Sequence, residues 1–286
     1  MQSNPHAMIV ACVDGSPYTD AVSDYAAWAA GRVEAGLKLL HTIDERPAAL
    51  ADLSGSIGLD SREQLLEDLV SLEEQRSRIL REEGKALLAD ISARLVSAGQ
   101  PQPVLRQRRG TLQNTLIDCE EDIRILVMGI RGLDHQDRAD HLGDQLESVA
   151  RALYKPILVV NREFTEPRKI MLAFDGSEGS RKALRMITDR PLLKGLPCHL
   201  VNVSQSRRSS AHLEDAVARL EQAGVTVTVA ELNGPPQEAL CNYQQREQID
   251  LTVMGAFSHT RIRDLLIGSF TVKMLLKTRQ PLLLLR

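Results

Sequence analysis

Two glycines and a serine near the C-terminal end of the chain have the types and the spacing of an anion-binding site. Gly255 follows the apolar run 251–254, and the pair Gly268-Ser269 stands where the next helix is expected to begin. Glycine lets backbone N–H groups approach a phosphate, and the first turn of a helix supplies unpaired N–H donors with a favourable dipole. This segment therefore predicts a site for a ligand that carries phosphate.

Strand ends of the same kind occur twice along the chain, which indicates an internal repeat. The run "MIVACVDGS" at 8–16 returns as "IMLAFDGS" at 170–177, and "IRILVMG" at 123–129 returns as "IDLTVMG" at 249–255. Each member of the first pair ends in Asp-Gly-Ser, and each member of the second ends in glycine. Self-similarity of this extent indicates two copies of one structural unit.

Short apolar runs alternate with helical segments, and this alternation predicts a parallel sheet covered by helices on both faces. We expect an α/β fold with two tandem Rossmann-like domains, each a five-stranded parallel sheet, at 1–161 and 169–286. The first carries an extra helical segment at 47–100, interpreted as one long helix or two joined near Gly84. A packing role for this segment is favoured over a partner-binding coiled coil, because few of its heptads are regular.

Composition limits the classes of function. The 286 residues include 43% hydrophobic residues and carry a formal net charge of −3, so neither nucleic acid nor membrane is an expected partner. Four widely separated cysteines and seven histidines lack metal-ligand spacing, and no metal site is predicted. The sequence shows no basic leader and no apolar stretch long enough to span a membrane. These features predict a cytoplasmic protein.

The repeat resembles the universal stress protein family in its tandem, two-domain form. Nucleotide-binding members of that family carry Gly, two residues, Gly, nine residues, then Gly-Ser or Gly-Thr. The second copy has this spacing, with Gly255 first, Ser258 in place of the second glycine, and Gly268-Ser269 last. The resemblance implies domains like those of the adenine nucleotide alpha hydrolases and a bound adenine nucleotide, ATP with or without magnesium. The implied contacts are Ala173, Asp175, Val203, Met254, Gly255, Ser258, Gly268, Ser269, Phe270 and Thr271.

The first copy departs further from the family's motif. Gly129 and Gly132 are followed by ten residues and then by Gly143 and Asp144. The aspartate stands where nucleotide binders of the family have a hydroxyl, and a carboxylate beside a phosphate is repulsive. The weaker site predicted here uses Asp14, Gly129, Gly132 and Gly143.

Three functions are compatible with these residues. The favoured one is a stress-response or regulatory protein that binds ATP mainly in the second domain and acts on an unknown protein partner, with no catalytic residues. An enzyme is the rival, either a slow ATPase or an adenylating enzyme, but the sequence lacks a GxxxxGK[ST] loop and a Ser-Gly-Gly-x-Asp-Ser loop. A dimerising scaffold with empty pockets or another ligand is the third. Asp14 and Asp175 also have a purely structural alternative, as caps of the helices that follow them.

Two apolar segments, 157–160 and 282–285, end the two copies. Each is apolar on both faces, and as a sheet edge it would leave a long hydrophobic strand in water. The family resemblance implies that they pair antiparallel and join the halves into an intramolecular pseudo-dimer. A homodimer would then use other surfaces, such as the extra helix of the first copy.

Overall fold

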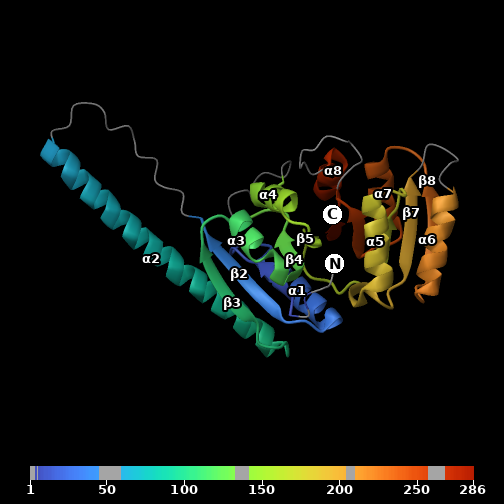
Figure 1. The fold of residues 1–286 in the computed structure, drawn as a ribbon, viewed down its shortest axis with the longest axis horizontal. Helices are drawn as coiled ribbons and strands as arrows, with labels where there is room; N and C mark the ends of the chain where they lie inside the picture. The colour runs from blue at the N-terminus through green and yellow to red at the C-terminus, as the bar shows by residue number, and fades with distance from the viewer. Residues whose placement is uncertain (1–3, 5, 45–58, 133–141, 204–209, 257–267) are drawn as a thin grey trace.

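The fold is taken from a computed structural model, which describes residues 4, 6–44, 59–132, 142–203, 210–256 and 268–286. One mixed sheet of ten strands crosses the molecule in the order β3-β2-β1-β4-β5-β10-β9-β6-β7-β8 (Figure 1). The N-terminal half holds β1 Met8–Cys12, β2 Leu37–Ile43, β3 Val104–Arg109, β4 Ile123–Gly129 and β5 Ile157–Val160. The C-terminal half holds β6 Ile170–Ala173, β7 Cys198–Val203, β8 Val227–Leu232, β9 Leu251–Gly255 and β10 Leu282–Leu285. Neighbouring strands within each half are parallel, so the predicted α/β fold with two Rossmann-like units is confirmed.

Helices cover both faces of the sheet. The N-terminal half has α1 Thr19–Val33, α2 Leu59–Ser97, α3 Leu112–Asp118 and α4 Asp144–Ala152. The C-terminal half has α5 Glu178–Asp189, α6 Ser210–Gln222, α7 Pro236–Arg246 and α8 Ser269–Lys277. One buried cluster lies between the sheet and α1, α2, α5 and α6, and a second lies between the sheet and α3, α4, α7 and α8. The strands are apolar on both faces because each face is buried under helices.

The two halves meet at β5 and β10, which pair antiparallel as predicted. Leu283 lies opposite Leu158, and both side chains are buried. Two further contacts support this join: the Asn161 side chain donates to the carbonyl oxygens of Thr278 and Gln280 at 3.0 Å. Neither apolar edge is left open to water, because each last strand covers the other.

In the described part of the extra segment, residues 59–100, there is a single helix, α2, rather than two helices joined near Gly84. Gly84 lies inside it, where a Cβ atom would be 2.5 Å from Cδ2 of His41 and 2.1 Å from Nε2 of Gln107. Glycine at this position therefore lets two strands approach the helix, and Gln107 Nε2 donates to the Arg81 carbonyl at 3.2 Å. The predicted packing on the sheet is correct only for the C-terminal part of α2, whose Leu88, Ile91 and Leu95 are buried.

In the described part of the chain, no helix is both long enough and apolar enough to cross a membrane.

The pairing of β5 with β10 predicts a strong effect of truncating Leu283, which has no exposed surface. Leu283→Ala should lower the free energy of unfolding by about 2–5 kcal/mol, because lost burial and a new cavity add. Val229→Ala, at a 45% exposed position of the edge strand β8, is the control and should change it by about 0.5 kcal/mol or less. Urea titration followed by circular dichroism measures both. Equal effects of the two substitutions would contradict the central role of this pairing.

Candidate functional site

The two Asp-Gly-Ser segments form the same turn after the first strand of each half. Asp14 Oδ1 accepts from the Ser16 N–H at 3.0 Å, and Asp175 Oδ1 accepts from the Ser177 N–H at 2.9 Å. The glycines between them have φ of 80° and 76°, in the left-handed region that favours glycine. Each aspartate thus shapes its loop through a bond to the backbone two residues on.

Neither aspartate caps a helix, so the structural alternative proposed from the sequence is wrong. The N-cap of α1 is Tyr18, and the N-cap of α5 is Ser177, whose hydroxyl accepts from the Ser180 N–H at 3.1 Å. Burial raises the pKa of Asp175, but hydrogen bonds from Ser177 and Ser180 outweigh it and leave the pKa below its usual value. Asp175 is therefore ionised at neutral pH and can accept hydrogen bonds from a ligand.

The glycines that end β4 and β9 permit a close approach of the start of α1 and of α5, respectively. A Cβ atom on Gly255 would lie 2.7 Å from the carbonyl carbon of Gly179, at the start of α5. A Cβ atom on Gly129 would lie 3.0 Å from Cβ of Tyr18, just before α1. Both glycines therefore have a packing role at the carboxyl ends of their strands.

The following helices begin where the sequence predicts. Gly268 is the N-cap of α8 and Gly143 is the N-cap of α4, and neither provides a side-chain acceptor for the first N–H groups. The Gly268 N–H donates to the carbonyl oxygen of Ala256 at 3.4 Å, and the Gly143 N–H donates to the carbonyl oxygen of Ile130 at 3.1 Å. The charges differ: the first turn of α4 contains Asp144 and Glu147, whereas that of α8 contains no acidic residue.

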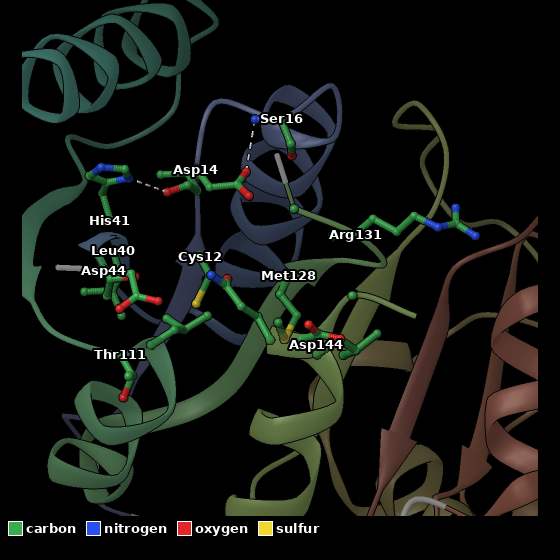
Figure 2. A pocket seen from close by; sticks show the side chains of 18 of the residues that line it. Cys12, Asp14, Ser16, Leu40, His41, Asp44, Thr111, Met128, Arg131 and Asp144 are labelled. Atoms are coloured by element: carbon green, nitrogen blue, oxygen red, sulfur yellow. Dashed lines mark hydrogen bonds between the residues drawn. The ribbon is translucent and has the colours of Figure 1, made fainter. Parts of the chain in front are cut away.

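A cavity of about 440 Å³ lies at the carboxyl ends of β1, β2 and β4 in the N-terminal half (Figure 2). All four residues predicted for the weaker site, Asp14, Gly129, Gly132 and Gly143, line it. Asp14 reaches across to the Gly132 loop, since a Cβ atom on Gly132 would lie 2.7 Å from Asp14 Oδ2. The strand ends that carry these four residues therefore lie together around one cavity.

Other lining residues were not predicted as site residues. They include His41, Arg76, Leu80, Thr111 and Arg131. His41 Nδ1 lies 2.9 Å from the Val13 carbonyl oxygen, and Asn202 bonds in the same way to Phe174 in the C-terminal half, at 2.7 Å. Alignment of the two copies pairs these positions and could have drawn attention to them. No local signal places Arg76 and Leu80 here, because α2 contributes them from the insertion.

Burial of Cys12, which also lines the cavity, raises the pKa of its thiol. The thiol is protonated at neutral pH and therefore a weak nucleophile. Among the residues that the structure describes, no group of histidine, cysteine, aspartate and glutamate side chains could hold a metal ion.

In the C-terminal half, the predicted residues gather at the ends of β6, β7 and β9 and at the start of α8. Ala173, Val203 and Phe270 are half-buried against the same apolar cluster, and Met254 is buried within it. The Thr271 hydroxyl is buried and donates to the Ala256 carbonyl at 2.7 Å. Thr271 therefore anchors α8 to the end of β9. The predicted contact Ser258 lies outside the described residues.

Comparison with known proteins agrees with this arrangement. The model of the universal stress protein family matches residues 8–161 and 204–286. The chain belongs to the universal stress protein family. The resemblance stated from the motifs is thereby confirmed.

The similarity to known universal stress proteins extends along the chain. Universal stress protein Slr1230 of Synechocystis sp. is 36% identical over 284 residues, which cover 97% of this chain and 99% of the relative. The crystal structure of a universal stress protein from Archaeoglobus fulgidus covers 100% of this chain and 99% of its own, with 18% identity and a TM-score of 0.75. A functionally unknown protein, PA1789 from Pseudomonas aeruginosa, covers 98% of this chain and 92% of its own, with 16% identity and a TM-score of 0.62. The two structures share the tandem fold with this universal stress protein.

The close approach at Gly255 generates a stability prediction for this universal stress protein. Gly255→Ala should lower the free energy of unfolding by about 1–3 kcal/mol, because the new methyl group meets backbone atoms that cannot turn aside. Gly31→Ala is the matched control: a Cβ atom there meets nothing within 4 Å, inside α1. It should raise stability by about 0.5–1 kcal/mol, since alanine favours helix interiors over glycine. Denaturant titration of both variants checks the opposite signs.

Proposed function

We propose that this universal stress protein is a regulatory protein that binds ATP, mainly in its C-terminal half, with little or no hydrolysis. The difference between the two helix starts carries the proposal. α8 begins after a glycine N-cap and has no acidic residue in its first turn, whereas α4 begins with Asp144 and has Glu147 in the same turn. A helix N-terminus attracts phosphate through its unpaired N–H groups and its dipole, and an acidic first turn opposes that attraction.

The C-terminal half supplies the groups that an adenine nucleotide needs. Ala173 and Val203 offer half-buried apolar surface against which a base can pack. The ionised carboxylate of Asp175 accepts hydrogen bonds, for which the amino group of adenine is a suitable donor. Ser269, at the first position of α8, adds a hydroxyl to the N–H groups that would face the phosphates. The bond from Thr271 to Ala256 holds that helix start in place.

The N-terminal half retains a cavity, but an acidic residue stands at the helix start that a triphosphate would face. A volume of about 440 Å³ is sufficient for a base and a sugar. Glu147 forms an ion pair with Arg151, which moderates its charge. Asp144 is the first residue of α4, at the point where a phosphate would meet the helix. Two like charges about 4 Å apart repel by about 4 kcal/mol at the effective dielectric constant of a protein surface.

The residue types present favour a regulatory role over a catalytic one. The sequence has no GxxxxGK[ST] lysine to polarise a γ-phosphate. The thiol of Cys12 is protonated, as its raised pKa requires. ATP in the C-terminal half would instead alter the surface offered to a protein partner. Four free cysteines suit a reducing compartment, and we place the protein in the cytoplasm on that basis.

Calorimetric titration with ATP tests the proposed asymmetry. The wild type should show one tight site per chain. Ser269→Asp should weaken it by about tenfold or more, which corresponds to 1.4 kcal/mol, because the carboxylate repels the phosphates. Ser269→Asn is the control for side-chain size and should retain more affinity than Ser269→Asp. Asp144→Ser should create or strengthen a second site in the N-terminal half. Two equal sites in the wild type would contradict the proposal.

Hydrolysis of ATP should be slow, because neither motif segment of the sequence, 129–144 or 255–271, contains a lysine that could pair with a base. Release of inorganic phosphate by purified protein should stay far below the usual enzyme range of about 1–1000 turnovers per second. Asp175→Asn should reduce the affinity for ATP. The rate of ATP hydrolysis should stay as low as in the wild type. Rapid turnover that is lost in Asp175→Asn would instead establish an enzyme.

A further inference from the structure

The N-terminal part of α2 extends beyond the sheet and exposes apolar side chains. In Figure 1 the helix passes along β3 and then continues away from the body of the molecule. Leu72 is 61% exposed and Ile79 is 55% exposed. By contrast, Leu88, Ile91 and Leu95 of the same helix are buried against the sheet and α1. Two large apolar side chains in water on a projecting helix are a candidate contact surface.

Leu72 and Ile79 lie on one face of α2, because seven residues make almost two full turns. The sequence has leucine at position 65 as well, so the same spacing extends further towards the start of the helix. The charged residues in this part of the sequence fall in two blocks. Segment 60–74 has six acidic residues and one arginine, whereas segment 75–81 has three arginines and no acidic residue. A helix with this distribution is complementary to an antiparallel copy of itself.

We propose that two copies of this protein associate through α2, paired antiparallel about a two-fold axis near Leu72. In this register Leu72 lies opposite Leu72 of the second copy, and Asp68 lies opposite Arg76 of the second copy. Arg76 is 3.7 Å from Glu73 of its own helix, and both side chains are largely exposed. An exposed ion pair of this kind contributes little, so Arg76 is available for the second contact. The two-fold axis repeats every pair, as an isologous interface requires.

Two other routes to self-association, through β5 with β10 and through β3, are less suitable. β5 and β10 pair with each other within one chain. The edge strand β3, with sequence "VLRQRR", has three arginines, and charge on an edge strand opposes pairing with another strand. One helix pair buries less than a standard interface of about 1,600 Å², so the dimer should be weak and favoured at low salt.

Sedimentation velocity of the full chain without nucleotide, over a range of protein concentrations, tests the pairing. The wild type should show a monomer–dimer equilibrium. Leu72→Lys combined with Ile79→Lys should raise the dimer Kd by about tenfold or more, equivalent to 1.4 kcal/mol. Val96→Lys is the matched control, because Val96 is also exposed on α2 but lies where the helix packs on the sheet. It should leave the Kd unchanged, and circular dichroism should be the same for all three proteins.

A charge exchange tests the antiparallel register. Asp68→Arg places arginine opposite Arg76 of the second copy, and Arg76→Asp places aspartate opposite Asp68, so each variant alone should dimerise less than the wild type. A mixture of the two variants should form heterodimers, because both contacts across the axis become attractive. Separate fluorescent labels on the two variants report the heterodimer by energy transfer.

Three experimental outcomes would contradict the proposed dimer or its register. A wild type that stays monomeric at every concentration would overturn it, as would a dimer unaffected by Leu72→Lys with Ile79→Lys. Failure of the mixed variants to associate would overturn the antiparallel register. None of these measurements contains ATP, so their outcome is independent of the proposed nucleotide site.

Discussion

The architecture depends on one constraint: the last strand of each half is apolar on both faces and needs a partner along its open edge. Antiparallel pairing of β5, Ile157–Val160, with β10, Leu282–Leu285, gives each strand a hydrogen-bonded neighbour along that edge. Because every other neighbouring pair of strands is parallel, this contact alone reverses the strand direction and converts two sheets into one. It also fixes the relation of the two halves, with both sets of strand ends displayed on a common framework. A single chain thereby builds what would otherwise require two subunits.

Within this framework, the two halves repeat the backbone and differ in charge. The turns at Asp14 and Asp175 have the same hydrogen bond and the same left-handed glycine. The helix starts at Asp144 and Ser269 also correspond in position. A helix start with a glycine N-cap is therefore present twice, and the halves differ in the acidic residues Asp144 and Glu147, which only α4 carries in its first turn. The proposed difference in nucleotide binding between the halves rests on this difference in charge.

The insertion that lengthens the N-terminal half performs two tasks along one helix. Its C-terminal part covers the sheet, and the side chains of Arg76 and Leu80 extend its contribution to the wall of the cavity. In the same stretch of the helix, Leu72 and Ile79 are exposed to solvent. The projecting part of α2 and the residues that it contributes to the wall of the cavity belong to one continuous helix. An association through α2 would therefore take place beside the N-terminal pocket and far from β10.

The sequence by itself determined the family, the α/β architecture, the internal repeat and the start of α8 at Ser269, because each of these follows from local patterns. Apolar runs, a glycine and a hydroxyl at fixed spacing are visible without knowledge of distant residues. Only the tertiary structure decided the roles that depend on distant contacts. It showed that Asp14 and Asp175 shape turns instead of capping helices, and that Thr271 bonds to Ala256. It also showed that α2 packs over only part of its length, because burial depends on where the sheet ends, and the sequence of a helix does not contain that position.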